Sequence, residues 1–272
     1  MTVNSFVDQL GREIQIPFPP KKIISIVPSQ TELLFDLGLE QEIIGVTKFC
    51  VHPKEKVKSK TKVGGTKNLN IEKIKSLQPD LIIGNKEENE EQQIRELMND
   101  FPVWMSDIKT LDDAYAMILS TGEVLNRMEW AELLVKEIKY AVGNWQSNME
   151  IEKLKIENRS CAYLIWNNPM MTVGNDTFIH HMLGVAGLEN VFADKSRYPE
   201  ITIEDLKLKA PQFVLLSSEP FPFGQKHVEE LQEQLPSAKI LLVDGEMFSW
   251  YGSRLLKAPK YFEELFFRKA KQ

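Results

Sequence analysis

The stretch LNIEKIKSLQPDLII, residues 69–83, recurs in pattern as ITIEDLKLKAPQFVL, residues 201–215. Glu72 and Glu204 are 132 positions apart, and so are the prolines of the two stretches. Each stretch has a polar N-cap candidate, an acidic residue in the first helical turn and a proline that ends the helix. An apolar run typical of a buried strand follows. The repeat predicts two similar α/β lobes, each with one carboxylate at the same place.

Short apolar runs and helical patterns alternate on both sides of this repeat. In the first half, strands are predicted at 23–27, 43–46, 81–83 and 103–105, with helices at 29–37, 70–78 and 87–99. In the second half, strands are predicted at 161–166, 213–215 and 240–243, with helices at 177–183, 226–234 and from 258. Such alternation is typical of parallel sheets covered on both faces. We therefore predict an α/β protein with two Rossmann-like lobes.

The segment that joins the predicted lobes has apolar residues at helical spacing from Leu111 to Met149 and contains no proline. It predicts a single long helix, which at 1.5 Å per residue is long enough to cross a domain. The alternative is two packed helices with a turn near Arg127. The predicted domains are an N-terminal arm at 1–20, a first lobe at 21–109, the connecting helix at 110–150 and a second lobe at 151–272.

The composition limits the partners of the chain. Its formal net charge of −6 and the lack of a basic stripe argue against nucleic acid. The lysine-rich segment 54–67 is interleaved with polar residues and is interpreted as a solvated loop. The two cysteines, Cys50 and Cys161, fall in different lobes and are expected to be free thiols rather than a disulfide.

The N-terminus gives an expectation about location. Residues 1–8 lack the basic and apolar regions of a signal peptide, and no apolar run approaches the length of a membrane span. The chain as written is therefore expected to be cytoplasmic. If a leader has been removed, a periplasmic or membrane-associated location is expected instead.

Candidate ligand-binding residues are those that follow the predicted strands, because open parallel sheets bind ligands beyond the carboxyl ends of their strands. The segments of the second lobe are rich in aromatic residues, which suits a large, flat, partly apolar ligand. The alternative is that half of these aromatics are ordinary core residues. The candidates are Ser29, Gln30, Phe49, Cys50, His52, Thr66, Lys67, Asn85, Trp166, Asn167, Arg197, Tyr198, Glu246, Phe248, Trp250 and Tyr251.

Catalytic and metal-binding motifs are weak. Cys50 and His52 leave open a hydrolase or lyase that uses both residues, but at i and i+2 of an extended segment they point to opposite faces. His180 and His181 are adjacent, which is unsuitable for a helical zinc pair. Gly64-Gly65-Thr66-Lys67 lacks the spacing of a phosphate-binding loop. We therefore expect no catalytic residues, no catalytic cofactor and no metal bound directly by the protein.

The motif PSQTEL at residues 28–33, together with the two IE-helix and strand units, resembles the cobalamin and siderophore substrate-binding proteins of ABC importers. The resemblance spans roughly residues 22–265 and is greatest to the vitamin B12-binding branch. It implies the fold of class III periplasmic binding proteins, with two lobes joined by one rigid helix and a ligand held between them. It also implies that Glu72 and Glu204 meet arginines of a permease dimer.

The chain departs from the cobalamin binders at several ligand positions. It has Thr66, and Gly84-Asn85, where they carry tryptophans, and Phe49 where they carry a tyrosine. Glu246 and Trp250 fall where they have an acid and an arginine. The resemblance implies a monomeric, non-enzymatic protein that delivers a corrinoid or iron-siderophore to an importer. The alternative is an intracellular carrier of such a chelate that meets no permease.

Overall fold

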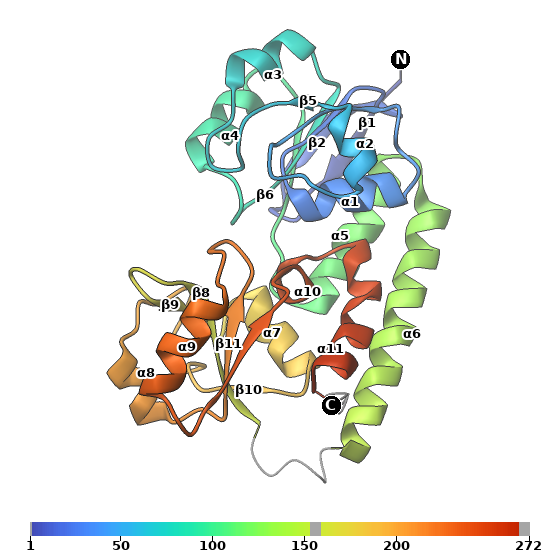
Figure 1. Ribbon diagram of the computed structural model, residues 1–272. Coiled ribbons are helices and arrows are strands. Elements are labelled where there is room, and N and C mark those ends of the chain that lie inside the picture. The colour runs from blue at the N-terminus through green and yellow to red at the C-terminus, as the bar shows by residue number, and fades with distance from the viewer. Residues whose placement is uncertain (1, 153–158, 267–272) are drawn as a thin grey trace. The chain divides into compact units, whose positions relative to one another are not determined.

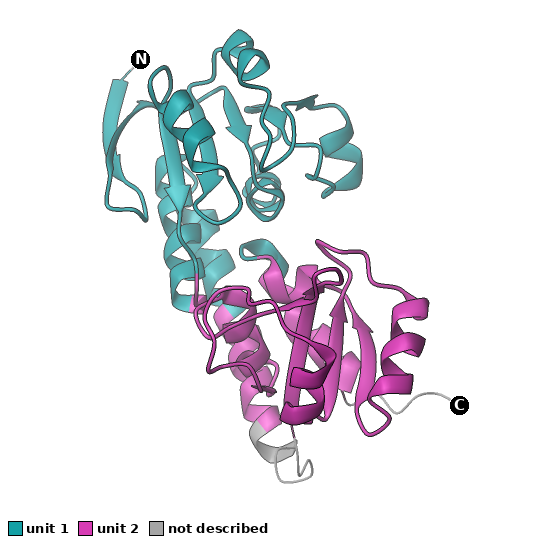
Figure 2. Cartoon of the chain, turned by 90° about the vertical axis from the view of Figure 1, so that its left-hand side faces the viewer, with its two compact units in different colours: residues 1–108, 112–138, 251–254 teal, residues 109–111, 139–250, 255–272 magenta. Residues whose placement is uncertain are grey.

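The structure is a computed structural model that describes residues 2–152 and 159–266. It divides into two compact units, which Figure 2 shows in different colours. The first consists of Met1–Ile108, Asp112–Ile138 and Tyr251–Arg254, and the second of Lys109–Leu111, Lys139–Trp250 and Leu255–Gln272. The segment Tyr251–Arg254 thus belongs to the first unit, whereas the predicted boundaries put it in the second lobe.

The first unit, in which Figure 1 labels strands β5 and β6, is built on a parallel sheet with the strand order β5-β4-β3-β6-β7. Its strands are β3 (Ile23–Ser25), β4 (Ile43–Val46), β5 (Thr61–Lys62), β6 (Leu81–Asn85) and β7 (Val103–Ser106). Its shorter helices are α1 (Pro28–Asp36), α2 (Lys54–Lys58), α3 (Ile71–Leu77) and α4 (Glu91–Met98). Alternate strand residues, such as Ile24, Ile82 and Met105, form one buried cluster with apolar residues of α3 and α4.

The second unit has a parallel sheet in the order β10-β8-β11-β12, to which β9 adds antiparallel to β8. Its strands are β8 (Ser160–Trp166), β9 (Met171–Thr172), β10 (Glu189–Asn190), β11 (Phe213–Ser217) and β12 (Lys239–Val243). Its helices are α7 (Phe178–Val185), α8 (Ile203–Lys209), α9 (Gln225–Gln234), α10 (Glu246–Ser249) and α11 (Ala258–Phe266). A 3₁₀ helix, η2 (Ser253–Leu256), precedes α11. Two parallel α/β lobes are therefore confirmed.

The two copies of the repeated unit fold in the same way. The side chain of Asn70 accepts a hydrogen bond from the backbone N–H of Lys73 at 3.0 Å, and Thr202 caps α8 through Asp205. Each helix then ends in a left-handed residue, Gln78 or Ala210, directly before the proline. Proline disfavours the helical conformation of the preceding residue, which explains why both helices stop there. The predicted caps and stops are confirmed.

The connecting segment is not one helix. It forms α5 (Leu111–Val124) and α6 (Met128–Glu152), separated by residues 125–127. Asn126 adopts a φ of 55°, and the N–H of Arg127 donates to the carbonyl of Gly122 at 2.6 Å. A Cβ on Gly122 would lie 2.4 Å from that of Ala131, so only glycine allows this approach. The predicted single helix at 110–150 is wrong, and the alternative with a turn near Arg127 is correct.

The lysine-rich segment 54–67 is more ordered than the solvated loop that we expected. It contains α2 and β5, and the buried side chain of Val57 anchors α2 to the unit. The ammonium group of Lys62 donates to the carbonyl of Val57 at 3.0 Å. Buried apolar contacts therefore override the polar composition of the segment. Within residues 2–152 and 159–266, no helix is long and apolar enough to cross a membrane.

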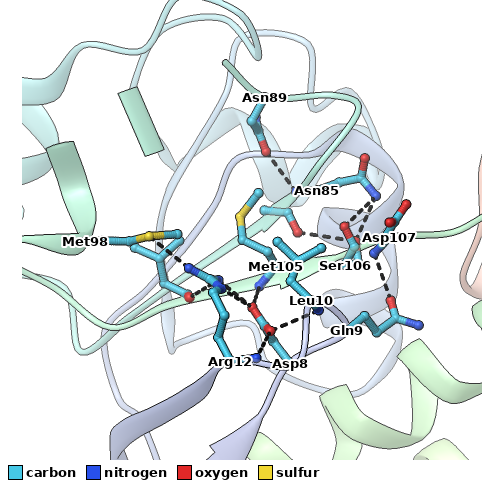
Figure 3. Close-up of polar contacts among 12 residues, drawn as sticks. Asp8, Gln9, Leu10, Arg12, Asn85, Asn89, Met98, Met105, Ser106 and Asp107 are labelled. Atoms are coloured by element: carbon cyan, nitrogen blue, oxygen red, sulfur yellow. Dashed lines mark hydrogen bonds and ion pairs between the residues drawn. The ribbon is translucent and has the colours of Figure 1, made fainter. Parts of the chain in front are cut away.

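The N-terminal arm is a hairpin that covers an edge of the first sheet. Strands β1 (Thr2–Val7) and β2 (Glu13–Phe18) pair antiparallel, and the turn between them packs against β7 (Figure 3). Asp8 accepts from the N–H of Met105 at 3.2 Å, while Arg12 donates to the carbonyl of Val103 at 3.0 Å. Gln9 completes the set by accepting from the N–H of Asp107. The turn thus satisfies backbone groups that an edge strand would otherwise expose.

Asp8 is expected to be important for stability, because its carboxylate is buried and accepts hydrogen bonds from three backbone N–H groups and from the guanidinium of Arg12. Asp8→Ala leaves these donors unpaired and should lower the free energy of unfolding by about 2–3 kcal/mol. Urea unfolding measures the change. The exposed acid Asp36 provides the matched control, since Asp36→Ala should have no measurable effect. Equal stability of Asp8→Ala and wild type would contradict the assigned role.

Candidate functional site

The carboxyl ends of the first sheet lie at one edge, because all its paired strands run in the same direction. From the central strand β3 the chain continues to β4 on one side of β3, and it later returns to form β6 on the other side of β3. The carboxyl end of β3 is therefore a topological switch point, where sheets of this kind bind ligands. α1 begins directly after β3 with Pro28 in its first turn and no side-chain cap. Two predicted site residues, Ser29 and Gln30, lie in that turn, and both are buried.

A buried polar network holds this edge together (Figure 3). The amide of Asn85 donates to the hydroxyl of Ser106 at 2.9 Å, and its oxygen accepts from the N–H groups of Glu87 and Glu88. The amide of Gln30 donates to the same hydroxyl. Asn85 is only 2% exposed, and its side chain is used within the unit. Its role within the unit is therefore structural, and its predicted ligand contact stays a prediction.

Phe49 is the exposed aromatic residue of this edge. Its side chain is 51% exposed and packs on the backbone of Gly65, where an added Cβ would lie 3.0 Å from the ring. The ammonium of Lys48 lies 5.0 Å from the ring centroid, a cation–π arrangement. The nearby Thr66 is half-buried, and the exposed Lys67 donates to the carbonyl of Glu87. This segment presents an apolar ring with the ammonium group of Lys48 beside it.

Cys50 is buried inside the first unit. Its sulfur is buried and lies 3.1 Å from the hydroxyl oxygens of Thr31 and Thr47. Burial raises the pKa of the Cys50 thiol above its ordinary value. The thiol therefore lacks the exposed, activated character of a nucleophile, whereas the predicted ligand contact of Cys50 stays a prediction. His52, two residues later, is half-buried.

In the second unit, Trp166 is the exposed aromatic residue at the end of a strand. It is 38% exposed, makes an edge contact with Phe221 at 5.7 Å between ring centroids, and donates its indole N–H to the carbonyl of Asn168. Arg197 is exposed in a left-handed conformation, and its guanidinium lies 5.6 Å from the ring centroid of the half-buried Tyr198. Asn167 is half-buried.

Phe248 belongs to the core of the second unit. It is completely buried and contacts the rings of Tyr163, Tyr261 and Phe262 at 4.9–6.3 Å between centroids. Its predicted ligand contact stays a prediction, and in this structure the ring packs among other aromatic rings. The alternative given to the aromatic segment, ordinary core packing, holds for this residue, because α10 directs it between β8 and α11.

Glu219 lies at a strand end of the second unit but is not among the candidate ligand-binding residues. It follows β11, and one oxygen accepts from the hydroxyl of Ser249 at 2.7 Å and from the indole N–H of Trp250 at 2.9 Å. Trp250 is buried, and Glu246 beside it is half-buried. The sequence shows an acid after a buried strand, but not that Trp250, 31 residues later, reaches it. Tyr251, the next predicted residue, is buried in the first unit.

Glu72 and Glu204 occupy equivalent places in the two units. Each lies in the first turn of its helix, α3 or α8, and each is exposed. Within the part of the chain that the structure describes, neither forms an ion pair. An acidic residue in this turn is stabilised by the helix dipole, and that alone explains its local preference. The predicted docking to a permease requires each carboxylate to be exposed and unpaired within its own chain, and both glutamates meet this requirement in the described residues.

Neither a metal-ligand cluster nor the main groove of the described residues coincides with the strand ends. No group of three or more His, Cys, Asp or Glu side chains in residues 2–152 and 159–266 is placed to hold a metal ion. A groove of about 700 Å³ lies between α6 and α11, where Trp145, Met149 and Pro259 line it. None of the predicted ligand-binding residues lines this groove. The groove is therefore separate from the candidate residues at the strand ends.

Comparison with known proteins identifies the family. Residues 23–238 match the family described as periplasmic binding protein. The vitamin B12-binding protein of Pectobacterium carotovorum is 25% identical over 243 residues, 89% of this chain and 86% of the relative. An uncharacterized ABC transporter substrate-binding lipoprotein of Bacillus subtilis is 30% identical over 213 residues, 76% and 67% of the two chains.

A similar solved structure agrees with the fold. The periplasmic heme binding protein of Pseudomonas aeruginosa superimposes with a TM-score of 0.80 and 20% identity, over 93% of this chain and 94% of that one. The match to the family covers most of the chain, including both copies of the repeated unit and the first parallel sheet. The chain therefore belongs to the periplasmic binding protein family, the non-catalytic substrate-binding proteins of ABC importers.

Proposed function

We propose that this protein captures a metal chelate of the corrinoid or siderophore class and delivers it to the permease of an ABC importer. The observation that carries the proposal is the similarity to a vitamin B12-binding protein over 89% of the chain. The structural neighbour from Pseudomonas aeruginosa is named for heme, another flat metal macrocycle. The relative in Bacillus subtilis is a lipoprotein, which favours a periplasmic or membrane-associated location for this protein.

The strand ends of the two units are suited to such a ligand. Phe49 in the first unit and Trp166 in the second are exposed aromatic rings beyond the carboxyl ends of parallel strands. Exposed rings of this kind bind the apolar face of a macrocycle, and the polar groups around them orient it. The other proposed contacts are Ser29, Gln30, His52, Thr66, Lys67, Asn167, Arg197, Tyr198, Glu246, Trp250 and Tyr251.

Native mass spectrometry and visible absorbance of protein purified without stripping its ligand test this proposal. A bound corrinoid or ferric chelate should add a defined mass and an absorbance band. Titration with cyanocobalamin, hemin and ferrioxamine B then shows which class is bound with affinity. A protein that copurifies with no chelate and binds none of the three would contradict the proposed function.

Phe49→Ala and Trp166→Ala are each expected to weaken binding of the chelate by about tenfold or more. Burying a large aromatic side chain against a ligand contributes about 1.5–3 kcal/mol. Isothermal titration measures the change in dissociation constant. Trp130→Ala is the matched control, because Trp130 is 60% exposed on α6 and is not a predicted contact. Unchanged affinity in a variant would remove that ring from the site.

A further inference from the structure

Glu219 joins the end of β11 to α10 in the second unit. Its Oε1 accepts two hydrogen bonds, from the hydroxyl of Ser249 at 2.7 Å and from the indole N–H of Trp250 at 2.9 Å. Ser249 ends α10 and Trp250 is the C-cap of that helix. One carboxylate oxygen therefore fixes both the end of the helix and the orientation of the indole ring.

The backbone around Glu219 leaves little freedom for movement. A Cβ on Gly245 would lie 2.4 Å from the hydroxyl of Ser217 and 2.7 Å from Cγ of Glu219, so only glycine fits there. The hydroxyl of Ser217 donates to the carbonyl of Glu219 and accepts from the phenol of Tyr163 at 3.0 Å. Glu219 is thus held between β8, β11 and the start of α10.

The second oxygen, Oε2, is available. It has no hydrogen-bond partner in residues 2–152 and 159–266, and it is not among the fully buried polar atoms without a partner, so it reaches solvent. Burial raises the pKa of Glu219, and the neighbouring carboxylates Glu246 of α10 and Asp244 after β12 raise it further. The phenol of Tyr163 donates to Ser217 rather than to this carboxylate. Three acidic residues, Glu219, Glu246 and Asp244, are therefore gathered at this strand edge beside an unused acceptor.

We propose that Glu219 is a positioning and specificity residue of the second unit. Through Oε1 it orients Trp250, and through Oε2 it accepts a hydrogen bond from an uncharged or cationic donor of the ligand. The inference rests on the proposed function, since it assigns the chemistry of the ligand at that site. Three neighbouring acids repel a carboxylate, so a chelate bordered by carboxamides binds here better than one bordered by carboxylates.

A ligand-free experiment tests the positioning role. In ¹⁵N-labelled protein, the indole N–H resonance of Trp250, assigned from Trp250→Phe, should shift as Glu219 titrates. The pKa of Glu219 is raised, so this shift should occur at higher pH than an ordinary glutamate would give. Glu219→Gln keeps the volume and should abolish the titration. Glu219→Asp, which keeps the charge but shortens the reach, should retain a titration with a displaced resonance.

A binding experiment tests the specificity role, with cyanocobalamin as the carboxamide-bordered probe and hemin as the carboxylate-bordered one. Glu219→Gln should weaken cyanocobalamin binding about tenfold at pH 7.5 and leave or improve hemin binding. Wild-type affinity for cyanocobalamin should fall as pH decreases and Glu219 becomes protonated, whereas the variant should show a flat profile. Glu233→Gln, at an exposed acid of α9, is the control and should behave as wild type.

The outcomes separate this inference from the proposed function. An indole resonance that does not depend on Glu219, or a variant that binds cyanocobalamin within twofold of wild type, overturns the inference while leaving the importer function intact. A wild-type protein that binds no metal chelate overturns the proposed function and the specificity role together. In that case the resonance titration still decides whether Glu219 positions Trp250.

Discussion

Glu32→Gln is expected to lower the free energy of unfolding of this protein by about 3–5 kcal/mol, the effect of removing one partner of a buried ion pair. Glu32 lies in α1 and Arg254 in η2, and both side chains are buried. The guanidinium donates two hydrogen bonds of 2.8 Å to the two carboxylate oxygens. Loss of the carboxylate charge removes the anion to which the buried guanidinium is paired.

Urea unfolding followed by fluorescence measures this effect, and a double replacement tests its origin. Glu32→Leu combined with Arg254→Met should recover most of the stability, because well-packed apolar residues replace both charges. The exposed pair of Glu91 and Arg95 on α4 is the matched control, and Glu91→Gln should leave stability unchanged within error. If Glu32→Gln unfolds at the wild-type urea concentration, the pair does not hold this unit together.

The pair also explains the place of residues 251–254 in the first unit. Arg254 binds α1 directly, and a Cβ on Gly252 would lie 3.3 Å from the side chain of Leu33 on the same helix. Gly252 has a φ of 110°, a conformation that other residues rarely adopt. A short segment distant in sequence is therefore part of the first unit's structure.

Glu72→Ala combined with Glu204→Ala is expected to reduce ATP-dependent uptake of the ligand by at least about tenfold while ligand affinity stays unchanged. Both carboxylates are exposed, and neither is a proposed ligand contact. If permease arginines bind them, the hydrogen bonds are charge-assisted and roughly twice as strong as neutral ones. Uptake into vesicles that contain the cognate permease, together with titration of free protein, separates docking from binding.

The controls distinguish docking from a role in the helix alone. Removing a first-turn acid weakens its helix through the dipole by at most about 1 kcal/mol, and this should leave uptake normal. Glu233→Ala, at an exposed acid of α9, should transport as wild type. Normal uptake by the double variant would exclude docking through these glutamates and would favour the intracellular carrier as the alternative function.

Much of the fold could be predicted from the sequence because its signals are local. The repeat at 69–83 and 201–215 combines an N-cap, a first-turn acid and a proline, each of which acts within one turn of chain. Apolar runs similarly mark buried strands, and their alternation with helices requires parallel sheets. The turn at Asn126 was harder to predict, because its helical spacing continues on both sides and only a single left-handed residue interrupts it.

The site could be predicted only as a set of strand ends. Which of those side chains are exposed depends on neighbours distant in sequence. Asn85 and Ser106 are 21 residues apart, Glu219 and Trp250 are 31 apart, and Glu32 and Arg254 are 222 apart. Phe49 and Phe248 are both phenylalanines that follow a predicted strand, yet Phe49 is exposed and Phe248 is in the core. Local propensity determines helices and strands, whereas burial and pairing of side chains depend on the packing of whole elements, which only the tertiary structure decides.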